Sequence, residues 1–116
     1  MLNKRRDKRV PLAATAVIKY ALEENAKPIQ TWIADISLSG IGVYSNGPIR
    51  EGAGLSIDVI FISAEGQKRT ASLQGNTIYT REMGGMYFIG IEFDEEINPA
   101  RQPALHERLR NILSCN

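Results

Sequence analysis

Apolar and polar residues alternate with a period of two along most of the chain, which is the pattern of β-strands with one buried face. The alternation begins at Leu12 and ends at Phe93. It predicts six strands, over residues 12–20, 29–37, 41–45, 55–61, 68–80 and 87–93. The parity becomes irregular at positions 75–76, where we predict a β-bulge. Strands this short and this regularly spaced favour an antiparallel barrel or a sandwich.

The second of these strands assigns its side chains to two faces by parity. Trp32, Ala34 and Ile36 share one face and are expected to point inward. Asp35 and Ser37 lie two positions apart on the other face. We therefore expect both of these polar side chains on the outer surface of the sheet.

Near the C-terminus the apolar period changes from that of a strand to that of a helix. The residues that form this apolar stripe are Leu105, Leu109, Ile112 and Leu113. Their spacing predicts a helix with one buried face, which we expect to cover an open end of a barrel. Asn98 followed by Pro99 suits a helix start, whereas Pro103 would allow a start several residues later.

The length of 116 residues suits a single domain. We divide it into a basic arm over residues 1–10, a barrel over residues 11–97 and a helical segment over residues 98–116. No apolar run reaches the roughly 18–20 residues of a membrane span, and no secretory signal is visible. We therefore expect a cytoplasmic protein without membrane insertion. Its one cysteine, Cys115, excludes an intrachain disulfide.

The basic charge is concentrated at the N-terminus. Residues 1–10 contain five Lys or Arg residues and one acid, whereas the other 106 residues contain nine bases and twelve acids. A protein that binds nucleic acid through its folded body more often carries a basic face on that body. Binding of DNA or RNA through the arm is therefore the less favoured alternative, and we expect no specific nucleic acid as a partner.

The sequence contains few groups for catalysis or metal binding. Its one histidine, His106, lies in the predicted helix beside Glu107, so a catalytic triad or a multi-histidine metal site is not expected. The glycines in "GIG" and "EGAG" lack the spacing of a phosphate-binding loop. We therefore predict that the chain is not an enzyme and has no catalytic residues, no metal site and no resident cofactor.

Two short motifs carry the chemistry that the sequence offers. In "DISLSG", the Asp35 carboxylate suits a guanine edge, the Ser37 hydroxyl suits a phosphate oxygen, and Gly40 permits a positive φ or a close approach. In "RRDKRVPL", Arg5 and Arg9 lie four apart, and arginine suits phosphates and the O6/N7 edge of guanine. Taken singly, the first motif also fits a strand end with turn-forming residues, and the second also fits a solvated tail.

In combination, R-x-x-x-R before the first strand and D-x-S-x-x-G at the end of the second resemble the PilZ domain, the bacterial receptor module for cyclic di-GMP. The later "IGIEF" of residues 89–93 is similar to the apolar-Gly-apolar-x-Phe strand of that family. The resemblance covers nearly the whole chain. It implies a mainly all-β fold, a six-stranded antiparallel β-barrel with a C-terminal α-helix.

The resemblance also implies a nucleotide site in which the arm folds over a ligand on the barrel surface. Arg5 and Arg9 would contact phosphates and guanine edges, and Asp35 would hold a guanine Watson–Crick edge. Ser37 would assist at a phosphate or base, and Gly40 would shape the turn beneath.

The expected function is a stand-alone receptor that binds cyclic di-GMP and signals in trans through an unidentified effector protein. Arg6 matches no fixed position of the motif, but it can stack on a base or touch a phosphate and is a further candidate contact. We expect the arm to be mobile in the free protein and ordered by the ligand. The alternative is a nucleotide-independent adaptor in motility or surface attachment, in which the motifs are unused.

Overall fold

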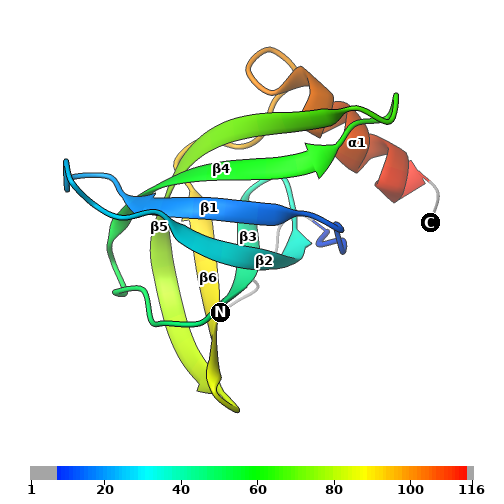
Figure 1. Cartoon of the computed structure of the whole chain (residues 1–116). Coiled ribbons are helices and arrows are strands. Elements are labelled where there is room, and N and C mark those ends of the chain that lie inside the picture. The colour runs from blue at the N-terminus through cyan, green and yellow to red at the C-terminus, as the bar shows by residue number, and fades with distance from the viewer. Residues whose placement is uncertain (1–7, 115–116) are drawn as a thin grey trace.

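The computed structural model describes residues 8–114, in which six antiparallel strands close into a barrel (Figure 1). The strands are arranged around the barrel in the order β1-β2-β3-β6-β5-β4. The bounds are β1 Thr15–Tyr20, β2 Ile29–Ile36, β3 Gly40–Ser45, β4 Gly54–Ile62, β5 Lys68–Met83, β6 Met86–Phe93 and α1 Pro103–Ser114. The predicted six-stranded barrel with a C-terminal helix is confirmed. Closure of the barrel removes the free strand edges that an open sheet would expose.

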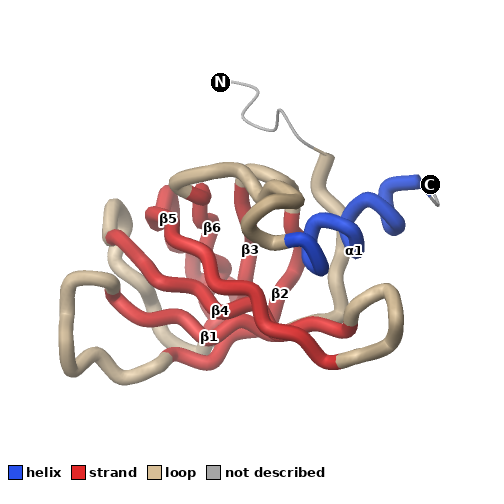
Figure 2. Tube along the Cα trace, turned by 90° about the horizontal axis from the view of Figure 1, so that it is seen from above, coloured by secondary structure: helices blue, strands red, loops and turns tan. Residues whose placement is uncertain are grey.

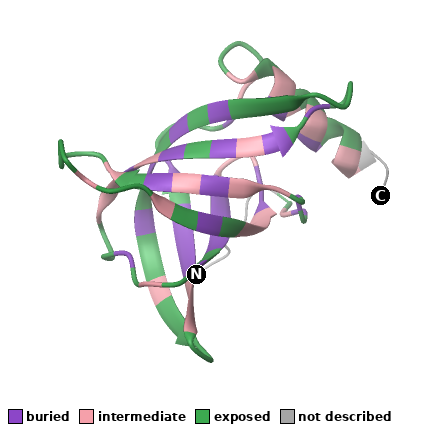
Figure 3. Ribbon diagram, in the orientation of Figure 1, coloured by how far each residue is buried: buried purple, intermediate pink, exposed green. Residues whose placement is uncertain are grey.

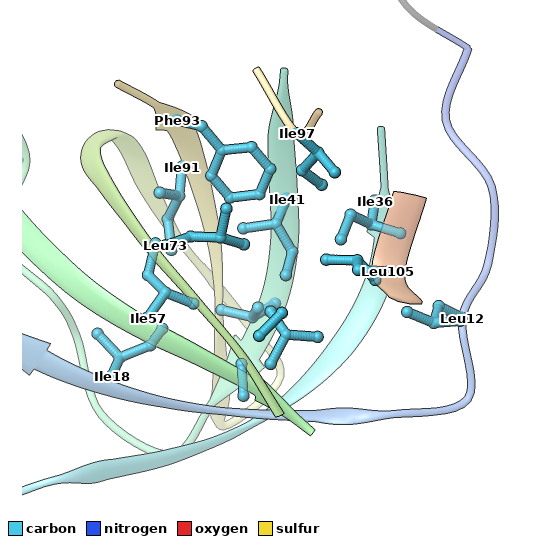
Figure 4. Close-up of a cluster of buried hydrophobic side chains, with 14 of the residues drawn as sticks. Leu12, Ile18, Ile36, Ile41, Ile57, Leu73, Ile91, Phe93, Ile97 and Leu105 are labelled. Carbon is cyan, nitrogen blue, oxygen red and sulfur yellow. The ribbon is translucent and has the colours of Figure 1, made fainter. Parts of the chain in front are cut away.

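Aliphatic side chains from all six strands fill the barrel, and buried positions alternate with exposed ones along the strands (Figure 3). Ile18, Ile57, Leu73 and Ile91 lie together in this core (Figure 4), and all four are buried. Burying a side chain of this size contributes roughly 1.5–3 kcal/mol. Because this packing fixes the strands, the outer wall of the barrel can present side chains in defined positions.

The prediction that Trp32 and Ala34 face inward together with Ile36 is wrong, because β2 contains a bulge. Its register with β3 shifts between Ile33 and Asp35, which inserts one residue and reverses the parity of the rest of the strand. Ile36 is fully buried, as predicted, whereas Trp32 is 47% exposed and Ala34 is only partly buried. The bulge puts Trp32 and Asp35 on the same outer face, although they are three positions apart.

The bulge in β5 lies beyond Gly75 and Asn76, so its predicted position is wrong. The register with β6 shifts between Thr77 and Tyr79. Gly75 faces the interior, where a Cβ would lie 2.5 Å from the carbonyl oxygen of Glu92, so the glycine lets β5 and β6 approach each other. The bulge turns Tyr79 onto the outer wall.

Helix α1 begins at Pro103, five residues after the predicted start at Asn98. Asn98 instead organises a turn, since its Oδ1 accepts hydrogen bonds from the backbone N–H groups of Ala100 and Arg101 at 3.0 and 2.9 Å. Proline suits the first helical position, where no N–H is needed for the helix. Within residues 8–114, no helix is long and apolar enough to cross a membrane.

The apolar stripe of α1 completes the core. Leu105 and Leu109 are fully buried and belong to the same cluster as the barrel residues. In Figure 4, Leu105 lies beside Ile36 at the end of β2 and near Leu12 just before β1. Figure 2 shows α1 lying over one side of the barrel. The helix thus packs against the segment that leads from the basic arm into β1.

Truncation of Leu105 to alanine should lower the free energy of unfolding by about 2–5 kcal/mol, because it leaves a cavity between α1 and the barrel. Urea-induced unfolding monitored by circular dichroism measures this change. Leu22→Ala is the matched control, since Leu22 is 95% exposed and its truncation should change the stability by less than about 0.5 kcal/mol. If Leu105→Ala were as stable as the wild type, α1 would not be part of the core.

Candidate functional site

Two backbone hydrogen bonds fix the point at which the chain enters the barrel. The N–H of Val10 donates to the carbonyl of Ile36, and the N–H of Ile36 donates to the carbonyl of Val10, both at 2.9 Å. The side chain of Val10 is buried in the core. This bridge holds the end of the basic arm against the end of β2, so that Arg9 lies beside Asp35.

Arg9 and Asp35 form a partly buried ion pair on the outer wall. Nη1 of Arg9 donates to Oδ1 of Asp35 at 2.8 Å, and the two side chains are 20% and 31% exposed. Nε of Arg9 is buried and has no hydrogen-bond partner among residues 8–114. An unsatisfied buried donor is rare and costly, particularly on a charged group. An acceptor on a ligand would satisfy it.

Gly40 lies close to this arginine. A Cβ at Gly40 would be 2.7 Å from the carbonyl oxygen of Ile91 and 3.3 Å from Nη2 of Arg9. The φ angle of Gly40 is not in the left-handed region. Of the two roles that the sequence suggested for this glycine, close approach of another group is therefore the one that applies. The glycine lets β3 pair closely with β6 and leaves room for the guanidinium of Arg9.

Ser37 holds the turn between β2 and β3, and the prediction that it lies on the outer surface is wrong. The residue is 3% exposed, and its Oγ accepts hydrogen bonds from the backbone N–H groups of Ser39 and Gly40, both at 3.2 Å. The cause is that β2 ends at Ile36, after which the chain folds into a serine-stabilised turn. Contact of Ser37 with a phosphate or a base stays a prediction.

Arg5 and Arg6 lie outside the described residues. Their predicted contacts with phosphates and guanine edges, and the predicted ordering of the arm by a ligand, therefore stay predictions. Of the candidate residues that the structure describes, Arg9, Asp35 and Gly40 come together at the outer wall. Ser37 supports the turn beside them.

The sequence alone did not reveal a row of aromatic side chains beside this site, which we call the aromatic strip. Its rings come from four strands that are neighbours in the barrel, namely Trp32 of β2, Tyr44 of β3, Phe88 of β6 and Tyr79 of β5. The ring centroid of Phe88 lies 5.3 Å from that of Tyr44 and 5.9 Å from that of Tyr79. The two bulges turn Trp32 and Tyr79 outward, which alternation alone does not predict. The outward parity of Tyr44 and Phe88 was visible in the sequence.

A second polar cluster lies at the far end of β1. Nη2 of Arg50 donates to Glu23 at 2.7 Å, and the guanidinium lies 4.1 Å from the ring centre of Tyr20. The hydrogen bond to Glu23 raises the pKa of Arg50 above its usual value. This cluster ties the loop after β1 to the loop before β4. In the described part of the chain, no group of three or more His, Cys, Asp or Glu side chains could hold a metal ion.

Comparison with known protein families gives one match. The family model described as the PilZ domain matches residues 3–113, nearly the whole chain. The chain belongs to the PilZ domain family. Both the end of the basic arm and the turn after β2 fall within the matched part of this PilZ domain. No curated protein matches the chain.

Several solved structures share this fold. The PilZ domain of YcgR from Escherichia coli with c-di-GMP has a TM-score of 0.68 and 17% identity, over 97% of this chain and 91% of that one. The MrkH–c-di-GMP complex of Klebsiella has a TM-score of 0.70 and 16% identity, over 98% of this chain and 53% of that one. MotI (DgrA), an inhibitor of motility from Bacillus subtilis, has a TM-score of 0.70 and 16% identity, over 97% and 53%. The chain spans about half the length of the MrkH and MotI chains, and at these identities the likeness shows the fold.

Because the Ser37 hydroxyl accepts two backbone donors, Ser37→Ala should lower the free energy of unfolding of this PilZ domain by about 1–3 kcal/mol without any ligand present. Urea titration of the purified protein measures the change. Ser56→Ala is the control, since the Ser56 hydroxyl makes one exposed contact, to Gln74 at 3.5 Å, and its loss should change stability by less than about 0.5 kcal/mol. Equal stability of the two variants would argue that the hydroxyl of Ser37 does not hold the turn.

Proposed function

We propose that this PilZ domain is a receptor that binds cyclic di-GMP at the Arg9–Asp35 site. The observation that carries the proposal is an ion pair on the outer wall in which the buried Nε of Arg9 has no acceptor among residues 8–114. The solved complexes of YcgR and MrkH with c-di-GMP support the choice of ligand. Cyclic di-GMP carries two phosphates and two guanines, so it offers acceptors to the arginine and donors to the carboxylate.

The two partners of the ion pair have complementary roles. Arg9 keeps Nη1 on Asp35 and offers Nε to a phosphate oxygen or to the O6/N7 edge of a guanine. Oδ2 of Asp35 makes no hydrogen bond with another described residue, and it accepts the N1–H or the amino group of guanine. Gly40 leaves the room that the arginine needs, and Ser37 fixes the turn below. The pair thus recognises a base and a phosphate without being broken.

The basic arm supplies the charge that the pair lacks. Since Arg9 and Asp35 neutralise each other, the two phosphates need further positive charge, and Arg5 and Arg6 precede Arg9 by only three or four positions. Charge-assisted hydrogen bonds from these arginines to phosphate oxygens offset the entropy lost when the arm is fixed, about 1–2 kcal/mol per residue.

The ligand-bound arm is the signal that we propose for a partner protein. Fixing residues 4–9 over the barrel wall creates a surface that depends on the nucleotide, and an effector that recognises this surface reads the ligand state. A partner that binds equally well with and without nucleotide would favour the adaptor function instead.

Arg9→Ala and Asp35→Ala should each weaken the binding of cyclic di-GMP at least tenfold, or about 1.4 kcal/mol, because each removes a direct contact. Isothermal titration calorimetry with the purified protein measures the affinity, and circular dichroism checks the fold of each variant. The matched controls are Arg69→Ala and Asp58→Ala. Arg69 is exposed and donates a hydrogen bond to Gln67, and Asp58 is exposed and accepts a hydrogen bond from Ser72. Both residues lie on the β4–β5 side of the barrel.

The controls should bind like the wild type. A folded Arg9→Ala or Asp35→Ala variant that also binds like the wild type would contradict the proposed site. Absence of binding to the folded wild-type protein at micromolar concentrations would contradict the proposed ligand.

A further inference from the structure

We propose that Tyr79 and Phe88, one half of the aromatic strip, form a stacking platform for a guanine base of the nucleotide held by Arg9 and Asp35. This inference rests on the proposed function and adds to its site two residues that lie outside both sequence motifs. The ligand class is a purine nucleotide whose base lies flat against the outer wall of β6 and β5.

The register of the barrel puts Tyr79 of the platform in the same row as Asp35. Asp35 pairs with Gly42, Gly42 pairs with Gly90, and Gly90 pairs with Tyr79. The row crosses β2, β3, β6 and β5, so its ends are separated by about 14 Å at the usual spacing of strands. Only glycines occupy the row between the carboxylate and the tyrosine. The row itself therefore carries no side chain between Asp35 and Tyr79, and the rings of Phe88 and Tyr79 lie over its glycines.

The two glycines also determine where the rings lie. A Cβ at Gly42 would be 2.8 Å from Cζ of Phe88 and 3.1 Å from Oδ1 of Asp35. A Cβ at Gly90 would be 2.6 Å from Cε2 of Tyr79. The rings of Phe88 and Tyr79 thus occupy the space that side chains at positions 42 and 90 would fill. The ring edge of Phe88 and the carboxylate of Asp35 converge on the same point above Gly42.

Packing of the core does not explain why the rings of Tyr79 and Phe88 lie where they do. Both project from the wall opposite to the aliphatic interior, and Tyr79 is 38% exposed. Tyr79 faces outward because of the bulge after Thr77. Bulges beside sites commonly redirect one side chain, and contiguous exposed aromatic surface commonly marks a binding site.

Stacking and hydrogen bonding would contribute differently to recognition of the base: stacking would provide affinity, and hydrogen bonding would provide base preference. A base that stacks on an aromatic side chain gains roughly 5- to 150-fold in affinity, with little preference among bases. Hydrogen bonds from the guanine edge to Asp35 provide the preference that stacking lacks. Trp32, at the other end of the aromatic strip, lies two strands from Phe88. Its ring is not among the nearest neighbours of a Cβ at Gly42 or Gly90, so we assign it no part in stacking.

The test compares variants that remove an aromatic face but keep an apolar side chain. In calorimetric titrations with cyclic di-GMP, Tyr79→Leu and Phe88→Leu should each weaken binding at least fivefold. Tyr79→Trp should bind at least as tightly as the wild type. Trp32→Leu is the control and should bind within twofold of the wild type, because it removes an exposed ring that is not among the nearest neighbours of Gly42 or Gly90.

A fluorescence measurement separates stacking from a structural effect. The chain has a single tryptophan, so Tyr79→Trp combined with Trp32→Phe leaves one reporter, at position 79. Saturating cyclic di-GMP should quench its emission, and GMP at high concentration should do so more weakly. Unchanged emission in a variant that binds the ligand would overturn the platform.

The two proposals fail in different ways. If Tyr79→Leu and Phe88→Leu bind like the wild type while Arg9→Ala does not, the platform is wrong and the receptor function stands. If Trp32→Leu weakens binding as much as Tyr79→Leu, the base lies elsewhere on the strip and the platform is also wrong. If the folded wild-type protein binds no cyclic di-GMP, both the receptor function and the platform that depends on it are wrong.

Discussion

The register shift in β2 is the constraint on which the outer wall depends. A strand that alternated strictly would have to turn either Trp32 or Asp35 into a core of aliphatic side chains, and an unpaired carboxylate there would be very costly. The extra residue between Ile33 and Asp35 resolves this conflict and still returns Ile36 to the core. The Val10 bridge to Ile36 then sets Arg9 against Asp35. The geometry of the ion pair is therefore determined by the backbone pairing around one bulge.

Alternation predicted all six strands, because a closed barrel with one apolar interior imposes a period of two on every strand. It was wrong where strand pairing inserts a residue, as for Trp32 in β2 and for the bulge predicted at Gly75 and Asn76 in β5. Pairing between distant strands decides such insertions, and local composition does not record it. The motifs led to Arg9 and Asp35 together, but not to the inward position of Ser37. A serine that closes a turn and a serine that meets a ligand have the same sequence signature.

The barrel separates the groups that fold it from the groups that we propose bind nucleotide. Aliphatic side chains and the stripe of α1 fill the interior. The outer wall combines an ion pair, a glycine row and aromatic rings within four adjacent strands. Together with the basic arm, these features match the three chemical parts of a cyclic dinucleotide: phosphates, base edges and base faces. Because its side chains project outward, the site can be altered without opening the core.

The most direct test of the central claim monitors the Nε–H of Arg9 itself by nuclear magnetic resonance during titration with cyclic di-GMP. This side-chain resonance should shift, and its exchange with water should slow, as the ligand saturates, because the buried donor then gains an acceptor. The Nε–H of Arg69, on the other side of the barrel, should not change. A ligand that binds with the Arg9 resonance unchanged would contradict the account.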